Sequence, residues 1–228
     1  MLRGIATEVR VSIIPYVEAE KARRKAEPAL QIDADPPSLA AIANRLVEVA
    51  MSMVDRVLDL AAKRHTKRFI ETAKKALGID IGAVVRDEDL TDYIAIAAGR
   101  NASLIRSLAA DIVKRVEQAT LQNLIANGSV AELRKKLTAE FGVVDSRAKV
   151  IARDQVAKIN SDLNRIRHQQ AGVTEYEWMT AHDERVRPLH RTLDGKVYAY
   201  GEPTGAEDGL PPGQPIMCRC IASGIVQF

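Results

Sequence analysis

Apolar residues recur at every third or fourth position along much of the chain. The clearest run follows Ser38 and predicts a helix over residues 38–77, with Ser38 as its N-cap and Gly78 just beyond its end. We expect this stripe to be mostly intramolecular core, with any uncovered part available to another protein. Its members are Leu39, Ile42, Leu46, Val49, Met53, Val57 and Leu60.

The spacing of proline and glycine predicts further helices. None of the nine prolines lies between residues 38 and 187, and single glycines punctuate that stretch, which is typical of consecutive helices. We predict helices over 103–126, over 129–141 with a stop at Gly142, and from about 145 to 171. Ser129 and Glu132 have the spacing of a capping box.

The N-terminal segment has a different character. Residues 1–27 are expected to form a helical arm that is interrupted near Pro15 and separable from the rest. Prolines and polar residues up to Pro37 indicate a linker after it. The sequence therefore predicts an arm and linker at 1–37 and a helical region at 38–144.

The hydrophobic period changes after Gly172. Tyr176, Trp178 and Thr180 alternate with more polar residues, which predicts a strand. A turn at residues 194–195, a short strand at 196–200, a Gly/Pro-rich loop at 201–215 and an extended segment at 216–226 follow. The expected fold class is α+β, with long helices in the N-terminal two-thirds and a small β-containing module within a C-terminal domain at 145–228.

Composition narrows the function classes. A content of 46% hydrophobic and 28% charged residues excludes a wholly disordered chain. The net charge is only +3 and no basic tail is present, so composition alone does not indicate nucleic acid. We expect no membrane span, because no run of about 18 apolar residues occurs. The N-terminus has no signal-peptide core, so we expect synthesis and retention in a cytoplasm.

The C-terminal module concentrates residues that bind metals or charges. His190, Cys218 and Cys220 offer three ligands to zinc, with a fourth from His182 or Asp183. The other interpretation is a module ordered by arginine–carboxylate pairs, which we favour because arginines outnumber soft ligands. No cofactor is then expected, and zinc stays an open alternative. The charge network would consist of Asp183, Arg185, Arg187, Asp194 and Arg219.

The two cysteines are too close in sequence for a disulfide framework, since in a strand they would point to opposite faces. The module's Asp, His and Cys residues stand in no recognised nucleophile motif, so we expect no enzyme activity. Trp178 is expected to be a core anchor, and His65 and His168 are expected to be exposed on their helices.

A local basic cluster lies on the first long helix. We favour its interpretation as the solvated face of that helix. Contact with the backbone of packaged DNA is the alternative, and it would be independent of base sequence and sensitive to salt. The cluster consists of Lys63, Arg64, Lys67 and Arg68.

The C-terminal module resembles the phage Mu F-like head-morphogenesis proteins, the minor head proteins of many tailed phages, over about the last 80 residues. The shared features are a helix with Arg and Asn, a strand with Trp, an Asp-x-Arg-x-Arg-x-x-His element, an Asp-Gly turn and a proline-containing loop that leads into Cys-Arg-Cys. The chain departs from the pattern at residues 214–217. The matching residues are Arg153, Asn160, Arg165, Trp178, Asp183, Arg185, Arg187, His190, Asp194, Gly195, Cys218, Arg219 and Cys220.

This resemblance implies a bacteriophage minor head protein, a structural component that assists capsid assembly. The implied partner is the portal protein, and the major capsid protein and double-stranded DNA, bound non-specifically, are further candidates. The implied location is the virion head, and the host cytoplasm during assembly. The alternative from another class is a zinc-dependent DNA-binding or processing module. Metal content separates the two, because only the alternative requires zinc.

Overall fold

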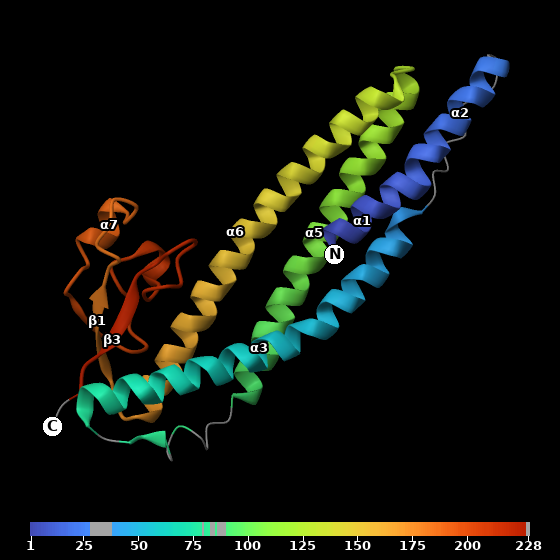
Figure 1. The fold of residues 1–228 in the computed structure, drawn as a ribbon. Helices are drawn as coiled ribbons and strands as arrows, with labels where there is room; N and C mark the ends of the chain where they lie inside the picture. Colours follow the sequence, from blue (N-terminus) through green and yellow to red (C-terminus); the bar gives the residue numbers. More distant parts are fainter. Residues whose placement is uncertain (28–37, 79, 83–84, 86–89, 227–228) are drawn as a thin grey trace. The chain divides into compact units, whose positions relative to one another are not determined.

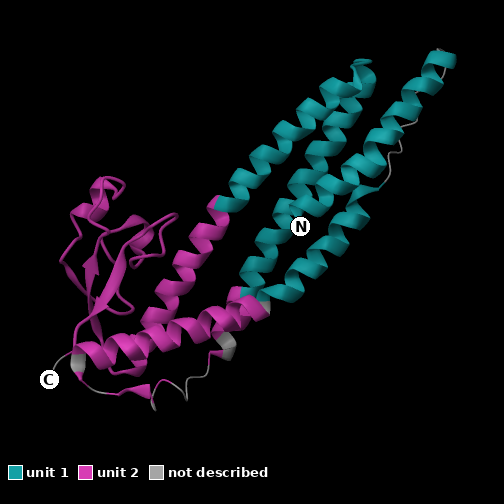
Figure 2. Cartoon of the chain, in the orientation of Figure 1, with its two compact units in different colours: residues 1–55, 98–149 teal, residues 56–97, 150–228 magenta. Residues whose placement is uncertain are grey.

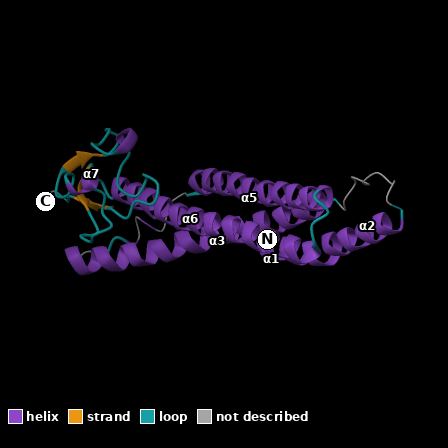
Figure 3. Ribbon diagram, turned by 90° about the horizontal axis from the view of Figure 1, so that it is seen from above, coloured by secondary structure: helices purple, strands orange, loops and turns teal. Residues whose placement is uncertain are grey.

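The computed structural model describes residues 1–27, 38–78, 80–82, 85 and 90–226. Long helices make up the first part of the chain, and a small antiparallel sheet lies near its end (Figures 1 and 3). The predicted α+β class is therefore confirmed. The helices before the sheet are α1 (Leu2–Glu8), η1 (Val9–Ile13), α2 (Ile14–Ala26), α3 (Leu39–Leu77), α5 (Thr91–Ile125) and α6 (Val130–Gln170).

The chain divides into two compact units, each built from two stretches of sequence (Figure 2). Unit 1 comprises residues 1–55 and 98–149, and unit 2 comprises residues 56–97 and 150–228. The sequence-based boundaries at 37/38 and 144/145 both lie inside unit 1. Since α3, α5 and α6 each pass from one unit to the other, each unit takes its helices from distant parts of the chain.

Polar contacts join the helices of unit 1. Arg115 of α5 lies 2.9 Å from Asp111 on its own helix and 2.7 Å from Glu140 on α6. Arg24 of α2 donates a hydrogen bond of 2.9 Å to the carbonyl oxygen of Leu124 near the end of α5. These contacts hold α2, α5 and α6 together as neighbours within the unit.

The N-terminal helix belongs to the core of unit 1. Ile5, Val9, Ile13 and Val17 are at most 3% exposed. The interruption predicted near Pro15 takes the form of the π-helical turn η1, which directly precedes the proline at the start of α2. A proline lacks the N–H that a regular helix would use, and a π-turn accommodates such a local mismatch without ending the helix. The expected linker up to Pro37 falls on residues 28–37, outside the described residues.

The apolar stripe predicted on α3 is only partly buried, which corrects the expectation that it is mostly core. Leu39 is buried, but Val49, Met53, Val57 and Leu60 are between 46% and 63% exposed. Two of the buried positions of the helix are alanines, whose small side chains permit close approach of a neighbouring helix. The buried residues of α3 are Leu39, Ala43, Val47, Leu58 and Ala62.

The helices after α3 are longer than predicted. Ser129 and Glu132 form the capping box, with Glu132 accepting from the Ser129 N–H at 2.7 Å and Ser129 accepting from the Glu132 N–H at 3.1 Å. The predicted stop at Gly142 is wrong, because α6 continues to Gln170. One interior glycine costs a helix about 1 kcal/mol relative to alanine, and burial of Leu137 and Val144 on either side offsets that cost. Similarly, α5 starts at Thr91 rather than at residue 103.

The C-terminal module contains the sheet. Its strands are β1 (Glu175–Met179), β2 (Val197–Ala199) and β3 (Ile221–Gly224), in the order β2-β1-β3 with both pairs antiparallel. The predicted first strand is confirmed, and its Trp178 is fully buried, as expected of a core anchor. The short helix α7 (Pro188–Arg191) and the 3-10 turn η2 (Glu207–Gly209) complete the module.

Candidate functional site

Three metal-ligand candidates converge in the core of the C-terminal module. The Nδ1 atom of His190 lies 3.5 Å from the Sγ of Cys218 and 3.5 Å from the Sγ of Cys220. All three side chains are at most 5% exposed, and their donor atoms lie within 4.8 Å of one another. Both cysteines are free thiols.

The two cysteines converge because they do not lie in a strand. The segment predicted as extended over 216–226 forms β3 only from Ile221, and Cys218 and Cys220 precede it in irregular backbone that directly follows a turn at residues 216–217. Met217 adopts a left-handed conformation, with φ 57°, immediately before Cys218. Such a backbone is uncommon for a residue with a side chain and persists only where its surroundings hold it. The turn thus allows both sulfur atoms to face His190.

Helix α6 holds that turn in place. The carboxylate of Asp154 accepts a hydrogen bond of 2.8 Å from the Met217 N–H, and Asp162 accepts one of 2.7 Å from the side chain of Gln214. Gly213 lies against Ser161, and a Cβ at this position would be 2.8 Å from the Ser161 Cβ. Gly213 also has φ 86°, so the approach of loop to helix requires glycine.

Glu207 orients His190 from the opposite side of the imidazole ring. Its Oε2 lies 2.7 Å from Nε2 of His190, and its Oε1 lies 2.7 Å from the guanidinium of Arg187. The hydrogen bond from His190 is the main cause that lowers the pKa of Glu207 to about 2, so its carboxylate is ionised and accepts. Nε2 therefore carries a proton, and in the neutral ring the lone pair of Nδ1 faces the two sulfur atoms.

Trp178 covers the cluster. Its ring meets the imidazole of His190 edge-on, with the ring centroids 5.4 Å apart. The same hydrophobic cluster contains Cys218 and Cys220 together with Leu193 and Ala206. The site is consequently set in apolar surroundings, where charged groups interact strongly.

The predicted charge network is formed differently from the expectation. Arg219 binds Asp183 through two nitrogen atoms, one of them 2.6 Å from Oδ2. This contact is the main cause that lowers the pKa of Asp183. Arg187 pairs with Glu207, which the sequence analysis missed. The side chain of Arg185 is 77% exposed and lies 3.9 Å from Glu184.

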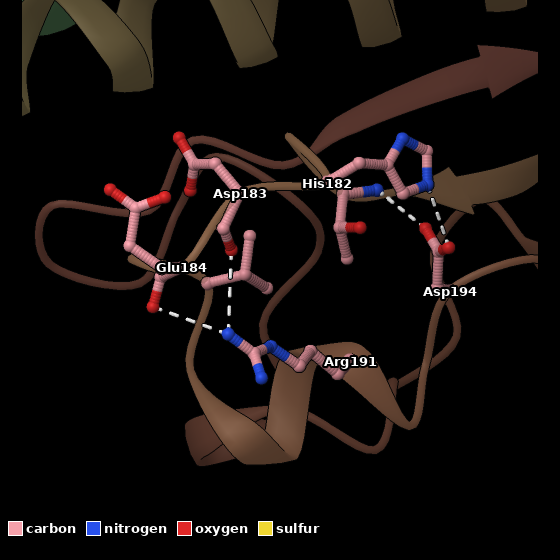
Figure 4. A pocket seen from close by; sticks show the side chains of 7 residues that line it. His182, Asp183, Glu184, Arg191 and Asp194 are labelled. Atoms are coloured by element: carbon pink, nitrogen blue, oxygen red, sulfur yellow. Dashed lines mark hydrogen bonds and ion pairs between the residues drawn. The ribbon is translucent and has the colours of Figure 1, made fainter.

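Asp194 binds no arginine among the residues that the structure describes. It accepts a hydrogen bond of 2.7 Å from the Thr180 N–H and lies 2.8 Å from Nε2 of His182 (Figure 4). The Thr180 N–H is the main cause that lowers the pKa of Asp194. Asp194 thus fixes the end of β1 rather than pairing with an arginine.

These residues border an open pocket of about 450 Å³ (Figure 4). Arg191 reaches across it to the carbonyl oxygens of Asp183 and Glu184, at 3.4 and 3.2 Å. Of its other charged groups, His182 pairs with Asp194, and Asp183 pairs with Arg219 outside the lining. The lining residues are Thr180, His182, Asp183, Glu184, Val186, Arg191 and Asp194.

The two candidates for a fourth metal ligand lie elsewhere. His182 is bound to Asp194 and Asp183 to Arg219, and neither belongs to the group formed by His190 and the cysteines. Within the described residues, that group is the one set of three or more such side chains that could hold a metal ion.

The basic cluster on α3 is exposed. Lys63, Arg64, Lys67 and Arg68 all face solvent, and Lys63 also lies 2.8 Å from Asp59. Their placement is compatible with a solvated face and with contact to a polyanion.

The expectation that His65 and His168 are exposed is wrong. Nδ1 of His65 accepts a hydrogen bond of 3.0 Å from the guanidinium of Arg167, which is itself fully buried. Burial, followed by the positive charge of Arg167, lowers the pKa of His65 to about 4. His168 packs between the rings of Phe69 and Tyr200, and burial lowers its pKa as well. Their charged sequence neighbours gave no sign of these contacts.

Comparison with known proteins identifies the part of the chain that contains this site. Residues 114–223 match the family described as "Phage Mu protein F like protein". These residues, just under half of the chain, are similar to the phage Mu F-like family. The matched segment includes all of α6, the sheet except for the last residue of β3, and the cluster of His190, Cys218 and Cys220. This similarity suggests a protein of phage head morphogenesis.

A relative from Haemophilus influenzae carries the name "Uncharacterized protein" and is 31% identical over 149 residues. The alignment covers 65% of this chain and 33% of the relative, so the chain spans about a third of that protein's length. No solved structure matches the chain. None of the helices in the described residues is long and apolar enough to cross a membrane.

Proposed function

We propose that the protein is a structural minor head protein that assists capsid assembly by binding the portal, close to packaged DNA. The observation that carries the proposal is the family match over residues 114–223, which includes the entire sheet-containing module except its last residues. The major capsid protein is a second protein partner in this proposal. No catalytic role is part of it.

The surface of α3 supports a role in binding another protein. Val49 and Met53 in unit 1 are 55% and 57% exposed, and Val57 and Leu60 in unit 2 are 63% and 46% exposed. Large apolar side chains exposed in series on one helix are typical of surfaces that another protein covers. Their exposure supports the proposal that a partner protein, here the portal, binds along this helix.

A binding experiment with purified portal protein tests the proposal. The full chain should co-elute with the portal in size-exclusion chromatography. Met53→Glu should weaken that association, because it places a charge among the exposed apolar side chains. Ser52→Glu is the matched control, since it adds the same charge at an adjacent exposed position. A folded chain that shows no association with the portal would contradict the proposed role.

The alternative function, a zinc-dependent DNA-binding or processing module, is favoured only by the cluster of His190, Cys218 and Cys220. It requires that DNA binding or cleavage depend on the metal. Unchanged DNA binding after removal of bound zinc by a chelator, with no cleavage in either state, would rule it out and leave the structural role.

A further inference from the structure

The distances within the cluster of His190, Cys218 and Cys220 fit a metal site as well as they fit hydrogen bonds. A tetrahedral zinc ion, with bonds of about 2.3 Å to sulfur and about 2.0–2.1 Å to nitrogen, places a sulfur and a nitrogen ligand about 3.5 Å apart. Both Sγ–Nδ1 distances are 3.5 Å. The two sulfur–nitrogen separations therefore match those that such an ion needs, and all three donor atoms lie within 4.8 Å of one another.

If all three side chains are neutral, hydrogen bonding to His190 does not explain why both thiols approach its Nδ1 atom. The proton of His190 is on Nε2, where Glu207 accepts it at 2.7 Å, so Nδ1 has one lone pair to offer. Two thiols approach that single lone pair at equal distances. A metal ion bound by Nδ1 and both sulfur atoms makes use of all three groups at once.

The surroundings match those of protein metal sites. A ligand histidine usually donates its other N–H to a carboxylate, which fixes the ring, and Glu207 does this for His190. The indole N–H of Trp178 is buried and makes no hydrogen bond of normal geometry to any of the described residues. It lies beside Cys220, and a thiolate there would give it an acceptor.

The cavity beside the three candidate ligands has the volume and the charge that a bound divalent cation requires. A cavity of about 30 Å³ borders all three candidate ligands, which is room for an ion and one small ligand such as water. Three arginines line the same cavity, but Arg187 is paired with Glu207 and Arg219 with Asp183, while Arg185 extends into solvent. Two thiolates would neutralise a divalent cation.

We propose that His190, Cys218 and Cys220 bind one zinc-type divalent cation through Nδ1 and two thiolates, with a fourth position open to water or to a ligand from another molecule. This site goes beyond the proposed role in the phage head, and neither depends on the other. Because the ligands come from α7 and from the turn before β3, the ion would join two distant parts of the module. Binding would release the thiol protons.

The test uses the full chain, purified under reducing conditions without added metal and then stripped with a chelator. Titration with zinc should end at about one ion per chain, and titration with cobalt should give thiolate-to-cobalt charge-transfer bands and the strong visible absorption of tetrahedral Co²⁺. The fluorescence of Trp178, the one tryptophan of the chain, should change in step. Portal binding is measured separately, so that failure of one proposal is distinguished from failure of the other.

Substitutions of the proposed ligands test where the ion binds. Cys218→Ser, Cys220→Ser and His190→Gln should each abolish stoichiometric binding, and Glu207→Gln should weaken it about 10–100-fold. His182→Gln is the matched control and should bind like the wild type, because His182 lies outside the cluster. Reduced, folded wild-type protein that takes up no zinc or cobalt would overturn the proposal without reliance on any variant. Retention of the cobalt spectrum by Cys218→Ser would overturn it too. A Cys218–Cys220 disulfide whose reduction yields no metal binding would instead indicate a redox pair.

Discussion

Nε2 of His190 donates a hydrogen bond of 2.7 Å to Glu207, and this contact determines which ring nitrogen faces Cys218 and Cys220. The same carboxylate binds Arg187 at 2.7 Å. One residue therefore connects the charged surface of the module to its buried cluster. The arginine-based and zinc-based interpretations of the sequence are compatible, since both sets of residues meet at Glu207.

Loss of this carboxylate should destabilise the module. Glu207→Ala leaves the Nε2 donor of His190, a side chain only 2% exposed, without its acceptor. An unsatisfied buried donor costs about 1–3 kcal/mol, to be measured by chemical denaturation in the absence of metal. Glu202→Ala, at an exposed acidic residue in the same loop, is the control and should change stability little. Equal effects of the two substitutions would show that the contact with His190 does not stabilise the fold.

The residues of the site were predictable to different degrees. His190, Cys218 and Cys220 are identified by chemical type alone, because few residues bind soft metals. Glu207 was missed because it lies in a Gly/Pro-rich loop without periodicity, and carboxylates are common in loops. The convergence of the cysteines depends on the left-handed backbone of Met217. Residues other than glycine rarely adopt this conformation, so a methionine in the sequence does not predict it.

For the helices, too, the sequence predicts some features and not others. Periodicity located α3, but only part of the predicted stripe is buried, because small residues such as Ala43 and Ala62 take several of the buried positions. Glycine alone did not end α6, because tertiary packing around Gly142 outweighs its low helix propensity. Helix existence was therefore predictable, while the buried face and the ends depend on contacts between helices.

Within the charge network, Asp194 should matter more than Arg185. Asp194→Ala removes the acceptor of the Thr180 N–H, whereas Arg185 is 77% exposed and lies 3.9 Å from its nearest carboxylate. We expect Arg185→Ala to change stability by no more than about 0.5 kcal/mol. Asp194→Ala should lower the melting temperature by clearly more. The reverse order in thermal melts would mean that Arg185 makes a contact in solution that its exposed position does not suggest.

The N-terminal helix should be part of the cooperative core of unit 1. Ile13 is 2% exposed, so Ile13→Ala should cost about 2–5 kcal/mol in the free energy of unfolding. Val11→Ala, at a residue 62% exposed on the same turn, is the control and should cost little. If residues 1–27 were instead a separable arm, as the sequence predicts, neither substitution would affect the main unfolding transition.

Acid should destabilise unit 2 through His65. Its pKa is lowered from 6.5 to about 4 by burial and by the charge of Arg167, so the unfolded chain binds a proton at a higher pH than the folded one. The neutral histidine therefore stabilises the fold above pH 6.5, and this contribution is lost as the pH falls from 6.5 to about 4. The melting temperature of the wild type should fall more over that interval than that of His65→Gln. His182→Gln, at a side chain 64% exposed, should behave like the wild type.

Contact of the α3 basic cluster with DNA is testable through its salt dependence. Each phosphate neutralised by a lysine or arginine contributes about 0.9 to the slope of log affinity against log salt concentration. The double substitution Lys67→Ala/Arg68→Ala should therefore reduce that slope by up to about 1.8, equally for duplexes of different sequence. Arg3→Ala/Arg10→Ala removes the same charge from exposed positions outside the cluster and should leave the slope nearly unchanged. Equal slopes for both double variants would show that Lys67 and Arg68 do not contact DNA and only form the solvent-exposed face of their helix.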